Sequence, residues 1–250
     1  MKDYEPALSF GREMAGKYDD IQRFSSTPSR LDPDAAVAFL AERAGAGPAL
    51  EFAIGTGWIA LPLAERGIRV AGIELSQAMV DRLIEKPGGT GVAVTVGDMA
   101  EVSVPGTYRL VYIVANSLSN LLTQESQVRC FENAARHMED SGLFVVEMFV
   151  PAFLYRSRGD QYVEAEAIEL DHVRLDVGRH DPVGQVLDES HVSLTPAGVH
   201  FDPIVTRYAW PAEMDLMARI AGLRLKERWG GWHGEPFTGA STHHISVYGR

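Results

Sequence analysis

The first half of the chain alternates short apolar runs with stretches of helical periodicity. The apolar runs predict five buried strands, at 49–54, 70–74, 92–96, 110–114 and 143–148. The stretches between them predict helices at about 59–66, 77–86 and 124–138, the last with Thr123 as its N-cap. Continuous apolar strands that alternate with helices indicate a parallel sheet covered on both faces. We therefore predict a doubly wound α/β fold, which binds ligands beyond the carboxyl ends of its strands.

The segments before this region are predicted to be helical. Residues up to about 30 form helical segments that Ser25–Ser29 interrupts. Asp32 is a good N-cap, and Pro33 is tolerated in a first helical turn, so a helix is expected from there to Arg43. These helices are expected to cap the amino-terminal side of the domain.

After Pro151 the pattern changes to alternating, β-rich segments. These lie at about 172–179, 185–194 and 200–210, separated by turn signals at 181–184 and 195–198. We expect an antiparallel β-rich insertion that serves as a lid or as a homodimer contact, since long additions to a fold usually carry function. A helix over 211–221 and strands at 223–229 and 244–248 complete a seven-stranded, mostly parallel sheet.

This organisation predicts two units. Residues 1–150 and 208–250 would form the nucleotide-binding domain with its helical cap, and residues 151–207 the lid or insertion.

Charge and composition limit the classes of partner that this chain is expected to bind. The formal net charge is −11 and the sequence pI is about 5.2, which weakens a nucleic-acid role because such proteins usually present a basic face to phosphates. No stretch approaches the roughly 20 apolar residues of a membrane span, and the N-terminus shows no secretory signal. One cysteine, Cys130, excludes an internal disulfide. We expect a cytoplasmic protein without a metal site.

Three motifs fall at the ends of the first three predicted strands. Glu51-Phe-Ala-Ile-Gly-Thr-Gly57 joins the first strand to the first helix, where glycines permit a tight turn and a close ligand. Glu74 ends the second strand, where a carboxylate can accept both hydroxyls of a ribose. Asp98 follows the third strand and can accept from an adenine amino group, while Met99 packs on the ring. Each motif alone is weak evidence, but their order along successive strand ends favours a nucleotide site.

The segment Glu51–Met148 resembles the class I S-adenosylmethionine-dependent methyltransferases, a Rossmann-like family. The family's first three motifs are similar to residues 49–64, 72–79 and 96–99, and 140–147 is similar to its turn into the fifth strand. The tail resembles small-molecule enzymes of the amino-sugar N-methylating type, which have a β-rich insertion after the fifth strand. In one departure, Ala53 replaces the first glycine of the loop. The resemblance implies S-adenosylmethionine as cofactor, held by these residues: Tyr18, Glu51, Ala53, Gly55, Gly57, Glu74, Leu75, Met79, Asp98, Met99, Ala115 and Asn116.

A nicotinamide enzyme is the second interpretation of this loop. Gly55-Thr-Gly-Trp-Ile-Ala60 fits the pattern Gly-x-Gly-x-x-Ala of dinucleotide sites. The chain has no Tyr-x-x-x-Lys pair, and Gly97-Asp-Met99 favours the sulfonium cofactor. The methyltransferase interpretation is therefore preferred.

The candidate catalytic and acceptor-binding residues each have a functional and a structural interpretation. Asn116 and Asn120 follow the fourth strand and either orient cofactor or acceptor or cap a turn, and Tyr18 resembles an aromatic residue that covers the cofactor in relatives. Glu147 ends the fifth strand, where it holds an amine or caps a loop. We expect Tyr18, Asn116 and Glu147 in catalysis. Acceptor binding is assigned to Asn120 and to residues that form an aromatic wall or only pack a loop: Trp229, Trp232 and His244.

Methyl transfer from a sulfonium requires an acceptor in line with the methyl carbon, and positioning and desolvation can supply much of the rate. A base is required only where the acceptor arrives protonated. We therefore expect methylation of a nitrogen or oxygen of a small molecule, in specialised metabolism. A second hypothesis is methylation of a peptide terminus or protein side chain, and a third is a cofactor-binding module without turnover.

Overall fold

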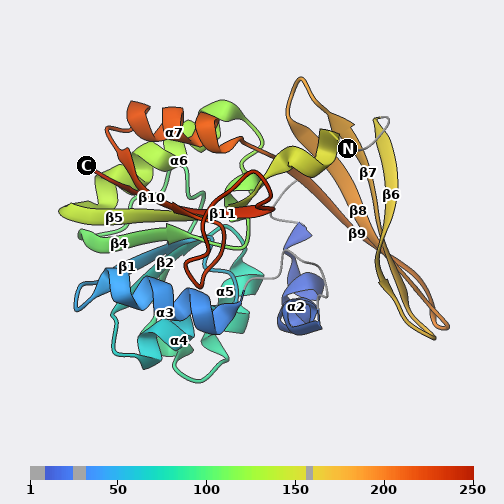
Figure 1. Cartoon of the computed structure of the whole chain (residues 1–250). Coiled ribbons are helices and arrows are strands. Elements are labelled where there is room, and N and C mark those ends of the chain that lie inside the picture. The colour runs from blue at the N-terminus through green and yellow to red at the C-terminus, as the bar shows by residue number, and fades with distance from the viewer. Residues whose placement is uncertain (1–8, 25–31, 156–159) are drawn as a thin grey trace.

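The computed structural model describes residues 9–24, 32–155 and 160–250, which contain two β-sheets (Figure 1). The larger sheet has seven strands, in the order β10-β11-β5-β4-β1-β2-β3, and the smaller has four, in the order β6-β7-β8-β9. The strands of the larger sheet are β1 (Ala49–Phe52), β2 (Val70–Glu74), β3 (Ala93–Val96), β4 (Tyr108–Ile113), β5 (Met138–Phe149), β10 (Arg224–Trp229) and β11 (His243–Gly249). Strands β1 to β5 pair in parallel, and β11 runs antiparallel to both β5 and β10.

Helices cover both faces of the larger sheet. Helices α6 and α7 lie on one face and α3, α4 and α5 on the other (Figure 1). The helices are α2 (Arg12–Phe24), α3 (Pro33–Ala44), α4 (Ala60–Glu65), α5 (Gln77–Ile84), α6 (Gln124–His137) and α7 (Pro211–Ile220), with short 3-10 turns at Gly89–Gly91, Ser117–Asn120 and Pro151–Tyr155. None of these helices is both long and apolar enough to cross a bilayer. The doubly wound, mostly parallel fold predicted from the sequence is confirmed.

The hydrophobic core divides between the two faces of the larger sheet because side chains alternate along each strand. Leu50 and Phe52 point toward α6 and α7, where they join a cluster with Phe131 and Phe144. Tyr112 of β4 points the other way, into the cluster under α3 and α4. The central strands are closed to solvent on both faces. Strand β3, predicted to be buried, is instead exposed to half-buried, because it lies at the edge of the sheet.

Local signals in the sequence set most of the boundaries. Asp32 caps α3 by accepting from the Ala35 amide, and Thr123 caps α6 by accepting from the Ser126 amide, as predicted. The predicted break at Ser25–Ser29 lies outside the described residues. Strand β5 begins five residues earlier than predicted, at Met138, because Met138 pairs with Tyr108 of β4.

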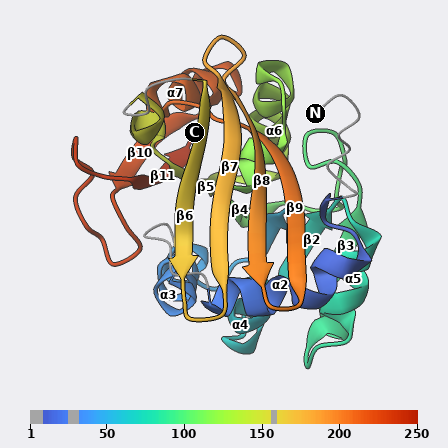
Figure 2. The same ribbon diagram turned by 90° about the vertical axis from the view of Figure 1, so that its right-hand side faces the viewer.

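The smaller sheet is formed by the insertion after β5. Its strands are β6 (Gln161–Ile168), β7 (Val173–Asp181), β8 (Val186–Thr195) and β9 (Gly198–Arg207), and each neighbouring pair is antiparallel. The predicted turns at 181–184 and 195–198 join β7 to β8 and β8 to β9. Strand β6 was not predicted as a separate strand; a bulge at Glu166, between Ala165 and Ala167, interrupts its alternation. Figure 2 shows this sheet standing in front of the larger one, with α2 beneath it.

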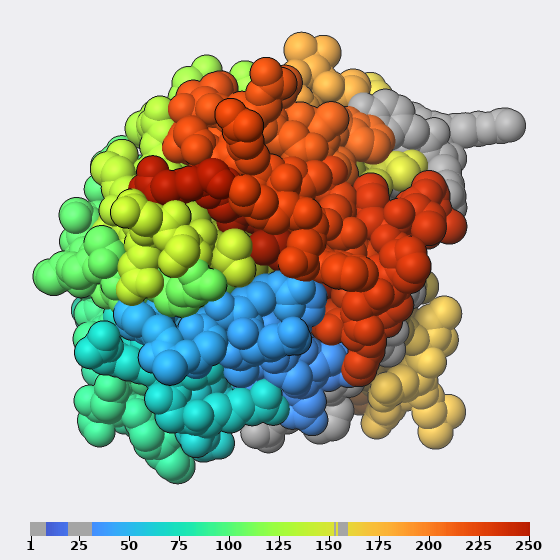
Figure 3. Space-filling model, turned by 60° about the vertical axis from the view of Figure 1, so that its left-hand side comes forward, coloured from blue at the N-terminus to red at the C-terminus, as the bar shows by residue number. Residues whose placement is uncertain are grey.

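The C-terminal segment packs beside α3, far away in sequence. Figure 3 shows orange-red atoms of the C-terminal segment against the blue atoms of the α3 region. The Trp232 ring meets Phe39 edge-on with centroids 5.3 Å apart, and Arg43 Nη2 lies 2.6 Å from Glu227 Oε2. These contacts close the sheet on the α3 side.

Candidate functional site

One cavity of about 420 Å³ lies at the carboxyl ends of the parallel strands. It is bounded by the loops after β1 to β5, by α2, and by the inner face of the smaller sheet, so it joins both sheets. The side chains and backbone that line it are Phe10, Met14, Tyr18, Ala53, Gly55, Ile73, Glu74, Leu75, Ser76, Met79, Gly97, Asp98, Met99, Ala115, Asn116, Ser117, Ser119, Asn120, Leu121, Phe149, Arg174, Leu187, Glu189, His191, Ile204 and Thr206. A volume of this size is typical of small-molecule sites.

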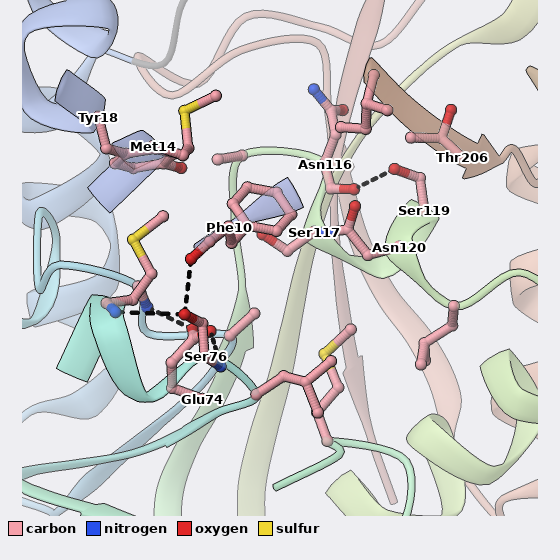
Figure 4. Close-up of a pocket in the computed structure, with 18 of the residues that line it drawn as sticks. Phe10, Met14, Tyr18, Glu74, Ser76, Asn116, Ser117, Ser119, Asn120 and Thr206 are labelled. Carbon is pink, nitrogen blue, oxygen red and sulfur yellow. Dashed lines mark hydrogen bonds between the residues drawn. The ribbon is translucent and has the colours of Figure 1, made fainter. Parts of the chain in front are cut away.

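Glu74 is fixed at one end of the cavity by backbone donors (Figure 4). Its Oε2 accepts from the Gly55 amide at 2.8 Å and its Oε1 from the Ser76 amide at 2.9 Å. A carboxylate has about four lone-pair sites, so each oxygen can still accept a further bond from the cavity side. Burial raises the pKa of Glu74, and the amide bonds oppose that rise. The arrangement suits a neighbour with two hydroxyl groups.

The loop after β1 needs left-handed backbone at alternate positions. The φ angles are +58° at Ala53, +55° at Gly55 and +79° at Gly57. Glycine adopts this region freely, whereas alanine there is strained by its Cβ. At Gly57 a Cβ would also lie 3.0 Å from the side chains of Leu61 and Leu83, so a larger residue does not fit without displacing them.

An apolar slot with one carboxylate at its edge follows β3. Met79 and Met99 are buried and line the cavity. Asp98 Oδ1 accepts from the Ala100 amide at 2.7 Å, while no described residue bonds to its Oδ2. A flat ring between the methionines would place its polar edge near Asp98.

The loop after β4 is held in an uncommon conformation. Ala115 and Asn116 have φ angles of +54° and +58°. Asn116 Oδ1 accepts from the Phe149 amide at 2.7 Å, and the Asn116 carbonyl accepts from Ser119 Oγ at 2.7 Å (Figure 4). Glu147 supports the loop from behind, since its Oε2 accepts from the Ala115 amide at 2.7 Å. Asn116 and Asn120, in this loop, both line the cavity.

Helix α2 covers the cavity and is bonded to the loops around it. Asp19 accepts from Thr56 Oγ1 at 2.6 Å and lies 2.7 Å from Lys86 Nζ. Burial alone would raise the pKa of Asp19, but the hydrogen bonds from Lys86 and Thr56 lower it. Met14 and Tyr18, on the same helix, reach the cavity lining.

The smaller sheet presents a cluster of ionisable side chains to the cavity. We call Glu166, Arg174, Asp176, Glu189 and His191 the charged face of the smaller sheet. Strand register places Asp176 opposite His191, and Arg174 Nε lies 2.6 Å from Glu166 Oε2. Three carboxyl groups thus surround one guanidinium and one imidazole, and the local balance is acidic.

Burial sets the proton affinities on the charged face. It raises the pKa of Glu189 to about 7, with a further rise from Asp176, although Tyr162 Oη donates to Glu189 Oε1. Burial also raises the pKa of Asp176 to about 6, and no described residue bonds to its buried Oδ1. No described residue forms an ion pair with Asp176 or Glu189, although the charge of His191 lowers the pKa of both and that of Arg174 lowers the pKa of Asp176. Glu166, by contrast, is paired with Arg174.

Eleven of the residues singled out from the sequence line this one cavity. They are Tyr18, Ala53, Gly55, Glu74, Leu75, Met79, Asp98, Met99, Ala115, Asn116 and Asn120. Their roles stay predictions, but the fold brings them together because successive parallel strands end at one edge.

Six others are not part of the lining. Glu51 is buried beneath the loop, where its Oε2 accepts from Tyr112 Oη at 2.9 Å, and Gly57 packs on Leu61 and Leu83. Glu147 is buried, and its Oε1 accepts from Trp232 Nε1 at 3.1 Å, so these two side chains bond to each other instead of lining the cavity.

The remaining two lie in the C-terminal strands. Trp229 Nε1 donates to Glu227 Oε2 at 2.8 Å, and His244 is fully buried against Ser246. Desolvation lowers the pKa of His244 to about 3, so the imidazole stays neutral. The structure thus offers no aromatic wall from Trp229, Trp232 and His244 to the cavity.

Sequence reasoning missed the lining residues of the insertion. Arg174, Glu189 and His191 stand at alternate positions of adjacent strands, and that alternation was visible in the sequence. The pattern did not reveal which face of the sheet would turn toward the cavity.

Comparison with known proteins decides the family. A family model described as a methyltransferase domain matches residues 49–142. The solved structure of the CcbJ methyltransferase from Streptomyces caelestis is 34% identical, with a TM-score of 0.88, and the match covers 98% of this chain and 99% of that one. The chain belongs to the S-adenosylmethionine-dependent methyltransferases. S-adenosylmethionine is accordingly the cofactor of this methyltransferase.

Two further relatives of the methyltransferase are informative. A cypemycin N-terminal methyltransferase from a Streptomyces species is 27% identical over 203 residues, which are 80% of this chain and 82% of that protein. The S-adenosylmethionine-bound structure of CalS10, an amino pentose methyltransferase from Micromonospora echinaspora, shares the fold with a TM-score of 0.66 at 21% identity, covering 92% of this chain and 95% of that one.

The residues that line the cavity at the ends of β1, β2 and β3 fit this cofactor. Glu74 keeps acceptor capacity on both oxygens for ribose hydroxyls, and Asp98 keeps a carboxylate oxygen beside the methionine slot for an adenine amino group. We propose that these residues and the Gly55 loop hold S-adenosylmethionine.

Proposed function

We propose that this methyltransferase transfers the methyl group to the nitrogen of a primary or secondary amine on a small molecule. The observation that carries the proposal is the Glu189 carboxyl group, which lines the cavity on the side of the smaller sheet with Asp176 near it, and neither carboxyl group forms an ion pair with a described residue. A buried carboxylate is stabilised by a cationic partner. An alkylammonium ion supplies such a partner, whereas a neutral hydroxyl does not.

Charge also favours an amine as the group that enters. The charged face sets Glu166, Asp176 and Glu189 against Arg174 and a histidine, so a cation is attracted and a carboxylate is repelled. As the nitrogen gains its methyl group it becomes a methylammonium, and the same carboxyl groups stabilise that charge. Interactions that strengthen as the charge forms on nitrogen lower the barrier.

The remaining lining residues would orient the reactants. S-adenosylmethionine supplies a methyl group on a positively charged sulfur, which is attacked from the opposite side. Asn116 and Asn120 line the cavity and can direct the acceptor nitrogen, while Tyr18 and Met14, from the helix that covers it, exclude water. Positioning and desolvation of this kind can supply several kcal/mol of barrier reduction (roughly 7 for well-oriented reactants).

We further propose the division predicted from the sequence. Residues 1–150 and 208–250 serve the cofactor, and residues 151–207 bind the acceptor. In this view the insertion selects the substrate, because the charged face belongs to it.

A second candidate acceptor is the amino terminus of a peptide. The relative named a cypemycin N-terminal methyltransferase supports it, since its name specifies an N-terminal amine. Only the first residue of a peptide would enter a cavity of about 420 Å³ that also holds the cofactor. Both candidates present the same ammonium group to Glu189.

The test is a methyl-transfer assay with S-adenosylmethionine against matched panels of alkylamines, alcohols and short peptides, detected by mass spectrometry. We expect methylated amines and no methylated alcohols. Glu189→Gln should raise KM for the amine about 10-fold or more, because a neutral amide replaces the carboxylate. The exposed Glu125→Gln is the control and should leave KM unchanged. Methylation of alcohols alone, or of no amine, would refute the proposal.

A further inference from the structure

The charged face also contains a histidine in the geometry of a proton acceptor. His191 lies on β8, an inner strand of the smaller sheet, and lines the cavity. Its Nδ1 is 3.2 Å from Glu166 Oε1, within ion-pair distance, although the direction misses that of a full hydrogen bond. Glu166 is held in turn by Arg174, whose Nε lies 2.6 Å from Glu166 Oε2. Arg174, Glu166 and His191 thus form a chain that ends at the imidazole.

The other ring nitrogen is left for a ligand. None of the described residues bonds to His191 Nε2, and the side chain keeps 28% of its exposure. With Nδ1 facing a carboxylate, the proton of a neutral imidazole belongs on Nδ1, and the lone pair is on Nε2. A histidine oriented by a carboxylate in this way is the arrangement used for general bases.

We propose that His191 is the general base that removes the proton from the ammonium acceptor, and that Glu166 and Arg174 are positioning residues for it. The inference rests on the proposed function, because only an amine that arrives protonated needs a base. It adds a catalytic residue from the insertion, which the motifs at the strand ends did not indicate.

The step balances in protons and electrons. His191 Nε2 takes one proton from R–NH₃⁺, which leaves R–NH₂ and an imidazolium. The freed lone pair on nitrogen forms the new N–C bond to the methyl carbon, and the C–S bond breaks with its electron pair going to sulfur. The products are R–NH₂–CH₃⁺ and a neutral thioether, and the imidazolium later releases its proton to solvent.

The groups around His191 suit a base near neutral pH. Glu166 of β6, Asp176 of β7, Glu189 of β8 and Asp202 of β9 face it with negative charge, and Arg174 faces it with positive charge. Lys17 of α2 neutralises Asp202 at 2.7 Å. Burial alone would lower the pKa of His191, but contact with Glu166 raises it above the usual value. The imidazolium formed in the reaction is therefore stabilised.

Glu189 is assigned a different task from His191. The Glu189 carboxyl group accepts from Tyr162 Oη and lies beside Asp176, which suits holding a cation in place. Loss of a holding group changes KM, whereas loss of a base changes kcat. The two assignments are thus separable by kinetics.

The experiment compares an alkylamine with its alkoxyamine analogue as acceptors for the wild type, His191→Gln and Glu166→Gln. The alkylamine, like a lysine side chain with a pKa of about 10, arrives protonated, whereas the alkoxyamine arrives neutral. We expect His191→Gln to lower kcat for the alkylamine about 100-fold or more. The kcat for the alkoxyamine should stay within about threefold of the wild-type value. Glu166→Gln should cause a smaller loss of about 10-fold and shift the kinetic pKa downward.

A second measurement covers the case in which a variant does not fold. In the wild type, the pKa of His191 from an NMR titration should lie above the usual histidine value and match the inflection of kcat/KM with pH. His172→Gln, in the turn between β6 and β7 and outside the cavity lining, is the control and should keep wild-type rates. Equal loss with both acceptors, or an NMR pKa that differs from the kinetic one, would overturn the assignment. Absence of any methylated amine in the wild type would instead refute the proposed function.

Discussion

At the end of β2, Glu74 links the shape of the site to its charge. Its carboxylate joins the Gly55 loop to the Ser76 amide that begins α5, so it orders two loops before any ligand binds. The same oxygens face the cavity. A single substitution therefore removes both the support of the loop and an acceptor for ribose hydroxyls.

Replacement of Glu74 should weaken cofactor binding more than any surface change nearby. We expect Glu74→Gln to raise the Kd of S-adenosylmethionine roughly 10-fold to 100-fold, since hydrogen bonds to a charged group contribute about 1.5–3 kcal/mol. Isothermal titration calorimetry measures the change. Glu85→Gln, exposed at the end of α5, is the matched control. Equal affinity in the wild type and Glu74→Gln would place the ribose elsewhere.

At the scale of the element, α2 connects the two sheets across the cavity. Ser76 Oγ donates to the Phe10 carbonyl at 2.6 Å, and Asp19 joins Thr56 and Lys86 on the cofactor side. On the other side, Lys17 Nζ lies 2.7 Å from Asp202 of β9. The helix that carries Met14 and Tyr18 is thus fixed at both ends of the cavity.

Loosening one end of α2 should reduce cofactor retention. We expect Asp19→Asn to raise the Kd of S-adenosylmethionine about fivefold, because the variant loses its ion pair with Lys86, a partly buried pair that contributes on the order of 1 kcal/mol. Stopped-flow release of the cofactor should be correspondingly faster. Glu13→Gln, on the same helix with its side chain 77% exposed, should bind normally. Similar values for both variants would show that α2 does not retain the cofactor.

The sequence pattern predicts the strands of the smaller sheet but not which of its faces lines the cavity. Strand alternation gives it two faces, and a hydrophobic argument would turn the apolar face inward. In the structure the charged face lines the cavity, while Val163 and Phe201, on the opposite face, are 65% and 62% exposed. Exposed apolar side chains are consistent with the homodimer contact predicted for the insertion, which stays a prediction.

At the scale of the whole molecule, Glu147 ties separate parts of the chain together. It is buried in β5 and accepts from the Ala115 amide and from Trp232 of the C-terminal segment. Burial raises the pKa of Glu147 from 4.5 to about 7. Between about pH 5 and pH 7, Glu147 therefore keeps its proton in the folded protein but has lost it in the unfolded chain. As the pH rises through this range, the contribution of Glu147 to stability falls.

This linkage predicts how the free energy of unfolding depends on pH. Relative to Glu147→Gln, the wild type should lose about 2 kcal/mol of stability between about pH 5 and pH 7, since one pKa unit corresponds to about 1.4 kcal/mol. Urea denaturation at each pH measures the difference in the free energy of unfolding between the two proteins. His244, whose pKa is lowered, is present in both and therefore cancels in this difference. The exposed Glu101→Gln should show no pH-dependent difference from the wild type. A constant difference between the wild type and Glu147→Gln would mean that Glu147 is ionised throughout.

The sequence by itself determined the larger sheet, the family and most of the cofactor half of the cavity. Glu74, Asp98 and the Gly55 loop were found because each lies at the carboxyl end of a predicted strand, and parallel strands bring these ends to one edge. Tertiary structure decided the acceptor half. It buried Glu51, Glu147 and His244 away from the cavity and turned Glu189 and His191 toward it. The reason is physical: a strand end is positioned by local pairing, whereas the face that a sheet presents depends on what it packs against.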